Sequence, residues 1–380
     1  MSSLNQFRFS RQSHHFGNDI TPNLWQRFHI DPWLLLLLIL TALCGLSILY
    51  SASGQDMALV MKQSLSYGIA FTVMVVMAQV PPGVYRDFTP FFYIGGVLLL
   101  LVVAVAGEVR LGARRWLHVP GLGSVQPSEF LKLGMPMMCA WFMSKREMPP
   151  SLLTVLSALA LILIPVLLIA KQPDLGTSLL VAASGLFVLF LAGLPWWMIG
   201  SAIALFVPFV FVAWEFLLHD YQRKRVLTLF DPEADALGAG WNIMQSKTAI
   251  GSGGLTGKGY LQGTQSHLQF LPEGHTDFII AAFSEEFGLT GVSLLMFLYA
   301  CILARALYIA YSCNNTYGRL LAGAIAMSFF VYVFVNAGMV SGILPVVGVP
   351  LPFISYGGTA LITLMAAFGL SMSIASHSTK

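Results

Sequence analysis

Long stretches of uncharged, apolar residues recur along almost the whole chain, and they decide what it can fold into. Most of them reach the roughly 20 residues that an α-helix needs to cross the hydrocarbon core of a bilayer. Turn residues divide the two longest stretches, at 193–195 and 341–358. The ten predicted membrane-spanning helices lie within 32–50, 63–85, 88–107, 128–144, 148–170, 175–214 (two helices), 287–312 and 320–379 (two helices).

The composition supports a protein whose surface faces lipid. Only 10% of the 380 residues are charged and 57% are hydrophobic, whereas a soluble domain carries about 25% charged residues. A net charge of +3, with no basic run interleaved with aromatics, argues against nucleic acid as a partner. We therefore predict an all-α, polytopic integral membrane protein, with an N-terminal tail (1–30) and a single ten-helix membrane domain (31–376).

The positive charges indicate the orientation. An even number of helices places both termini on one side, which holds nine of the 20 Lys and Arg residues, against eleven on the other side. Nine of those eleven lie in or beside two polar segments, 107–132 and 215–276. If these segments are exempt because they are functional, the positive-inside rule predicts cytoplasmic termini. The loops 107–127 and 215–276, the latter between the seventh and eighth helices, are then extracytoplasmic.

The first polar segment combines basic residues with the start of a helix. Arg115 lies in the run GARRW, and Pro127-Ser128-Glu129 follows a turn-rich stretch. Ser128 suits a helix N-cap, and Glu129 and Lys132, three residues apart, share a helix face on which they can pair. An interfacial anchor with a structural ion pair is the simpler interpretation, and a functional pair is the alternative.

The second polar segment runs for about sixty residues without a membrane span. Loops of that length are usually functional or disordered, and its aromatic and aliphatic residues argue against disorder. Its glycine-rich part, AIGSGGLTGKGYLQG, fails the phosphate-loop pattern, because Ser252 stands where Gly is needed and Gly259 where Ser or Thr is needed. We expect these glycines to provide tight turns and close packing.

Several acidic residues lie where polar loop meets apolar chain. Desolvation at such a position raises the pKa of a carboxyl group and nearby cations lower it, so Asp277 suits a general base. Glu286 follows in the same apolar region, and Asp174 lies at a helix junction, where it is either a helix cap or a functional group. His267 and His275 lack a partner pattern, so no metal site is predicted.

Seven motifs, in this order along the chain, resemble those of one family: GARRW (112–116), QPSEFLKL (126–133), QPDLGTS (172–178), QSKTAIGSGGLTGKG (245–259), FLPEGHTDFI (270–279), EEFGLTG (285–291) and LPFISYGG (351–358). The chain resembles the SEDS family (shape, elongation, division and sporulation proteins) over nearly its whole length beyond the first thirty residues. The runs AIGSGGLTGKG and MVSGILPVVGVPLP (339–352) favour the rod-shape branch of that family.

This resemblance implies a peptidoglycan glycosyltransferase of the bacterial inner membrane. It would polymerise lipid II, an undecaprenyl-pyrophosphate-linked disaccharide-pentapeptide, into β-1,4 glycan strands for cell elongation, with its catalytic face in the periplasm. The resemblance also implies a complex with a class B penicillin-binding protein and association with the other membrane proteins of the elongation complex.

The resemblance further assigns roles to individual residues. Asp277, in HTDF, is the expected catalytic base. The sugar transfer displaces a polyprenyl pyrophosphate with inversion, so it also needs positive charge to bind the departing pyrophosphate. Arg can supply this charge by binding phosphate oxygens bidentately, and Lys can supply it as a point charge. A divalent cation could share that work, although no dedicated ligand cluster is visible. The predicted substrate-binding residues are Arg115, Glu129, Lys132, Asp174, Arg223, Lys258 and Glu286.

Two other functions stay open at this point. A lipid II transporter would also use intramembrane charges and broken helices. However, the two halves of the chain show no evident repeat, and the ionisable residues gather at one face of the membrane. A scaffold that only recruits the penicillin-binding protein is the third interpretation, and Asp277 would then be dispensable.

Overall fold

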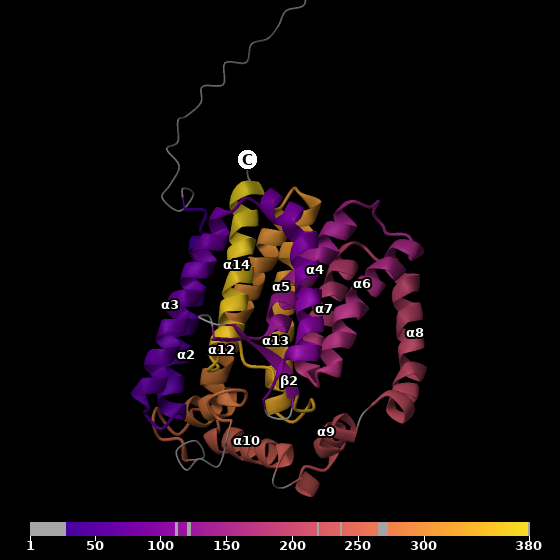
Figure 1. Ribbon diagram of the computed structural model, residues 1–380. Helices are drawn as coiled ribbons and strands as arrows, with labels where there is room; N and C mark the ends of the chain where they lie inside the picture. Colours follow the sequence, from indigo (N-terminus) through magenta and orange to yellow (C-terminus); the bar gives the residue numbers. More distant parts are fainter. Residues whose placement is uncertain are drawn as a thin grey trace, which may run out of the picture.

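In the part of the chain that the structure describes, ten long helices lie side by side and form the body of the protein (Figure 1). The computed structural model describes residues 28–110, 113–119, 123–218, 220–235, 238–264 and 273–378. Within them the ten helices are α2 (Pro32–Ala52), α3 (Met57–Gln79), α4 (Pro82–Ala106), α5 (Pro127–Ser144), α6 (Leu152–Lys171), α7 (Leu175–Leu191), α8 (Trp196–Val212), α12 (Ile279–Ser312), α13 (Thr316–Val340) and α14 (Gly358–Ser378). Eight helices of the described residues are long and apolar enough to cross a membrane. The predicted multi-pass, mainly helical membrane fold is confirmed.

One predicted boundary is wrong. The sequence analysis divided 63–85 from 88–107 at the charged pair Arg86–Asp87, but α3 ends at Gln79 and α4 begins at Pro82. The two helices are divided at the prolines 81–82, because proline has no backbone N–H to donate to the preceding turn and is favoured at a helix start. Arg86 and Asp87 are exposed and pair with each other at 3.2 Å in the first turns of α4.

The helices differ in how much of their surface the protein covers. In α13 and α14, 61% and 67% of the residues in the most apolar 18-residue stretch are buried, so these two helices lie at the centre of the bundle. Only 6% of the corresponding stretch of α8 is buried, and α8 stands at the edge of the bundle (Figure 1). Most of the apolar surface of α8 is therefore left uncovered by the other described helices.

The described parts of both predicted functional loops lie at one end of the bundle and contain regular structure (Figure 1). Segment 107–127 includes three short antiparallel strands in the order β1 (Glu108–Arg110), β2 (Ala113–Val119) and β3 (Gly123–Val125), which the all-α prediction did not include. Segment 215–276 includes α9 (Asp220–Phe230) and α10 (Ala239–Gly253). The start of α2 and the end of α14 meet at the opposite end, where His29 Nδ1 lies 3.0 Å from Ser376 Oγ.

Helix α12 is interrupted at Gly288, and the glycine-rich segment fills the interruption. Gly288 has φ of 64°, and a Cβ there would lie 2.3 Å from Gly257 N. Lys258 N and Gly259 N donate to Glu285 O and Glu286 O, while Leu289 N donates to Gly254 O. These bonds satisfy backbone groups that the interruption leaves without an intrahelical partner. The expectation that the glycines allow close packing is confirmed, and the part of α12 after Gly288 coincides with the predicted span 287–312.

Candidate active site

The turn before α12 holds Asp277. The backbone amides of Thr276 and Phe278 both donate to Glu273 O at 3.1 Å, which closes the turn. The Asp277 side chain is partly buried, and its Oδ2 faces Gly348, where a Cβ would lie 3.4 Å away. Desolvation by burial, together with the negative charge of Glu273, raises the pKa of Asp277 from 3.8 to about 6. Such a carboxyl group is ionised at neutral pH and remains a competent base.

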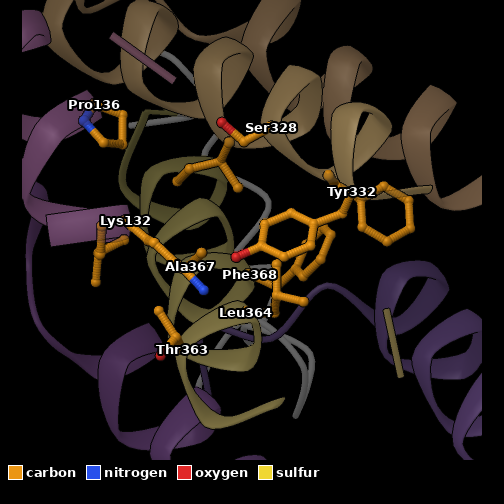
Figure 2. Close-up of a pocket in the computed structure, with 11 residues that line it drawn as sticks. Lys132, Pro136, Ser328, Tyr332, Thr363, Leu364, Ala367 and Phe368 are labelled. Atoms are coloured by element: carbon orange, nitrogen blue, oxygen red, sulfur yellow. The ribbon is translucent and has the colours of Figure 1, made fainter. Parts of the chain in front are cut away.

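A second group of polar side chains surrounds Lys132, within the bundle. Lys132 Nζ lies 2.6 Å from Glu129 Oε1, and both side chains are largely buried. Thr363 Oγ1 donates to Glu129 Oε2 at 3.2 Å. Figure 2 shows the amino group of Lys132 and the hydroxyl of Tyr332 pointing toward one another, with Nζ 5.5 Å from the ring centroid. Lys132, Tyr332, Thr363 and Ser328 are among the residues that line a cavity of about 30 Å³, which is enough for a water molecule.

Arg115 and Asp174 meet where the strand β2 lies against the α6–α7 junction. The Arg115 guanidinium donates to the backbone carbonyls of Gln172 (3.0 Å) and Pro173. Its Nη1 lies 3.9 Å from Asp174 Oδ2, which also accepts from Gln126 Nε2 at 2.9 Å. Asp174 Oδ1 accepts from Thr177 N at 3.1 Å, so Asp174 caps α7 as well as pairing with Arg115. Arg115 thus fastens β2 to the membrane helices.

Helix α13 connects the Lys132 group with Asp277. Tyr332 and Asn336 are four residues apart and therefore share one face of α13. Tyr332 lies beside Lys132, and Asn336 Nδ2 donates to Asp277 O at 2.8 Å. One turn of α13 thus separates the residue that contacts Lys132 from the residue that holds the backbone of Asp277.

The other predicted site residues lie elsewhere. Lys258 Nζ pairs at 2.6 Å with Glu285, which is completely buried. Glu286 is also buried and accepts a hydrogen bond from Ser51 Oγ. Arg223, on α9, donates to Glu215 O at 2.9 Å, and no contact described here joins it to Asp277 or Lys132. Lys258 and Glu286 thus lie at the glycine-rich junction with α12, apart from the Lys132 group.

Three residues of the site were missed by the sequence analysis: Tyr332, Asn336 and Thr363. Each lies in a stretch that was interpreted only as membrane span. A polar side chain in such a stretch is itself a signal, because its burial needs a partner. Tyr332 and Asn336, at helical spacing in an otherwise apolar run, could have been found in this way.

Over the described ranges, no three His, Cys, Asp or Glu side chains are grouped so that they could hold a metal ion. The His275 ring lies 6.2 Å from the Tyr356 ring, centroid to centroid. His267 lies outside the described residues.

Comparison with known proteins identifies the family. The family model FtsW/RodA/SpoVE, described as cell cycle protein, matches residues 31–380. The chain belongs to this family. Its curated relatives include the FtsW/RodA/SpoVE member MrdB of Escherichia coli K12, named peptidoglycan glycosyltransferase, which is 53% identical over 93% of this chain and 95% of its own length. The peptidoglycan glycosyltransferase RodA of Treponema pallidum is 31% identical over 90% of this chain and 96% of its own length.

Solved structures similar to this chain show the same fold. A chain from a study of polymerization and crosslinking by a peptidoglycan synthase complex superposes with a TM-score of 0.81 at 31% identity, covering 92% of this chain and 98% of its own length. The rod shape determining protein RodA of Thermus thermophilus gives a TM-score of 0.68 at 28% identity, with the same coverage. The predicted resemblance to the SEDS family is confirmed, and so is a polytopic membrane fold of the RodA type.

Proposed function

We propose that this chain is a peptidoglycan glycosyltransferase that polymerises lipid II for cell elongation. Relatives named peptidoglycan glycosyltransferase match nearly the whole chain, and the match covers 95% and 96% of their own lengths. The observation that carries the proposal is Asp277, a partly buried carboxyl group with a pKa of about 6, in the turn before α12, a helix that is bonded to the segment following α10. One turn of α13 joins its backbone to the buried Lys132–Glu129 pair.

In the proposed reaction Asp277 accepts the proton of the acceptor sugar's 4-hydroxyl. The oxygen of that hydroxyl forms a bond to C1 of the donor sugar, and the bond from C1 to the polyprenyl diphosphate breaks. Inversion at C1 converts the α-linked donor to a β-1,4 product. Lys132 provides positive charge for the departing diphosphate, while Glu129 and Tyr332 hold its amino group.

The other predicted binding residues take different places in this proposal. Arg115 and Asp174 act by holding β2 over the site, since their polar atoms bind each other and the α6–α7 junction. Lys258 and Glu286 shape the junction between the glycine-rich segment and α12. Arg223 remains a candidate for contact with the diphosphate, and a divalent cation could share in neutralising it.

Orientation and partners complete the proposal. The termini face the cytoplasm and the end bearing β2, α9 and α10 faces the periplasm. Once the two polar segments are exempted as functional, nine Lys and Arg residues lie on the side of the termini and two on the other side, so the positive-inside rule assigns the termini to the cytoplasm. A class B penicillin-binding protein is the proposed partner for transpeptidation, with other elongation-complex membrane proteins around it. A solved relative comes from a peptidoglycan synthase complex, which supports this assignment.

The test is polymerisation of lipid II by the purified full-length chain in detergent, with and without a class B penicillin-binding protein. Detergent micelles have no compartments, so transport cannot register as product. We expect the wild-type chain to elongate glycan strands and Asp277→Asn to lose about 10²–10⁴ in rate. Asp87→Asn, a matched change at the opposite end of the bundle, should retain wild-type rates. Normal polymerisation by Asp277→Asn would show that another group is the base, whereas no polymer from the wild-type chain would leave the scaffold or transporter interpretation.

A further inference from the structure

Three consecutive backbone carbonyls before α12 each accept a hydrogen bond from α13 or from the loop between α13 and α14. The bonds run from Tyr356 N to His275 O (3.0 Å), from Ser355 Oγ to Thr276 O (2.6 Å) and from Asn336 Nδ2 to Asp277 O (2.8 Å). We call this set the carbonyl clamp. It fixes the backbone on which the Asp277 side chain stands.

Asn336 holds two segments at once. Its side chain is fully buried, and its second N–H donates to Val349 O at 2.7 Å. Two carbonyl acceptors determine which end of the amide is the nitrogen. The amide oxygen is buried with no hydrogen-bond donor in the described structure, which costs stability. A contribution to stability alone therefore does not explain why an amide side chain occupies this position.

Ser355 links the clamp to the loop that faces the carboxylate. Its hydroxyl is buried, accepts from Leu351 N at 2.8 Å and donates to Thr276 O. The same loop carries Gly348, which lies against Asp277 Oδ2 with φ of 74°. The loop between α13 and α14 therefore contacts Asp277 on its backbone side and on its carboxylate side.

We propose that Asn336 and Ser355 are positioning residues for glycosyl transfer, which hold the backbone of residues 275–277 so that the Asp277 carboxylate keeps one orientation toward the acceptor hydroxyl. The inference rests on the proposed function, in which Asp277 is the base. Neither side chain needs to touch the substrate. Misplacing a reacting group by about 1 Å can cost roughly 100-fold in rate, so such residues can matter greatly.

The experiment uses the full-length chain in detergent with lipid II. Ser355→Ala removes one clamp donor, Ser355→Thr keeps the hydroxyl, and Asn336→Leu replaces the amide with an apolar group of similar size. Ser373→Ala is the matched control, because Ser373 is fully buried and its Oγ donates to Val80 O at 2.5 Å at the opposite end of the bundle. For each variant kcat, KM, the pH–rate profile and the thermal midpoint are measured, together with hydrogen exchange of the 273–279 peptide.

We expect Ser355→Ala and Asn336→Leu to lower kcat by roughly 10- to 100-fold with KM unchanged, and Ser355→Thr to recover most of the loss. A released carboxylate gains water and its pKa falls, so the acidic limb of the profile should move to lower pH. Exchange of the 273–279 peptide should accelerate in both variants and not in Ser373→Ala.

Two results would separate failure of the clamp from failure of the proposed function. Variants that melt earlier than the wild type but keep its kcat, acidic limb and exchange would show a merely structural role and overturn the clamp. If the wild-type chain itself made no polymer, the proposed function would fail, and hydrogen exchange would then judge the clamp alone. In that case, hydrogen exchange of the 273–279 peptide at the wild-type rate in both variants would also overturn the clamp.

Discussion

Replacing Asp277 with Asn should stabilise the protein while it abolishes activity, and the stabilisation should depend on pH. The pKa of Asp277 rises from 3.8 to about 6 on folding. The difference of about 2.2 units, at 1.36 kcal/mol per unit, corresponds to about 3 kcal/mol. The side chain is only partly buried, so water screens its charge and we expect about 1–3 kcal/mol.

The sign follows from the direction of the shift. Above about pH 6 the carboxyl group is ionised in both the folded and unfolded states, and the folded state bears the full cost of the desolvated charge. Below about 3.8 the group is protonated in both states and that cost disappears. The advantage of Asp277→Asn should therefore be full at pH 7–8 and decline through the window between these two values.

Thermal midpoints of the detergent-solubilised wild type and Asp277→Asn, measured from pH 4.5 to pH 8, test this reasoning. Asp87→Asn, at an exposed site, serves as the control. The wild-type activity should also show an acidic limb near pH 6, where half of the Asp277 carboxyl groups are protonated. A variant that is less stable than the wild type at pH 7.5, or whose advantage is the same at every pH, would show that Asp277 is not desolvated.

The remaining predictions concern the buried ion pairs and Arg115. Lys132→Ala should cost about 3–5 kcal/mol in stability, because it leaves Glu129 buried without its cation, and should impair polymerisation. The double change Lys132→Met with Glu129→Gln should restore the thermal midpoint but not turnover, whereas recovered turnover would make the pair structural only. Lys258→Met should destabilise the protein by a similar amount, and adding Glu285→Gln should reverse most of the loss in thermal midpoint. If Lys258→Met alone were as stable as the wild type, the pairing of Lys258 with Glu285 would be contradicted. Arg115→Lys should cost about 1–3 kcal/mol, because a single ammonium cannot replace the forked contacts to two carbonyls, and limited proteolysis should then cleave near β2 sooner.

Much of this architecture was predictable because membrane helices follow simple rules. Backbone groups in lipid must pair within their own helix, so apolar length alone located nearly every span. Charge was a poorer guide to boundaries: Arg86 and Asp87 lie inside α4, because side chains near the end of a helix reach the membrane surface. Proline at 81–82 was the better signal there.

The site was predictable only in part, because its contacts join segments far apart in the sequence. Glu129 and Lys132 pair as their spacing of three predicted. The partners of Arg115 are backbone carbonyls at 172–173, which no pattern in the residue types reveals. Asn336 was missed for a related reason, since its contacts are with the backbone of other segments rather than with a motif of its own.

The interruption of α12 has a mechanical consequence. On both sides of Gly288, α12 is bonded through its backbone to the segment that follows α10: Glu285 O and Glu286 O accept hydrogen bonds from that segment, and Leu289 N donates to it. The first part of α12, to which Asp277 is attached directly, is therefore tied to this segment and also, through Asn336, to α13. A force applied to α10 would therefore reach the Asp277 turn and α13 together, because the same short stretch of α12 is bonded to both.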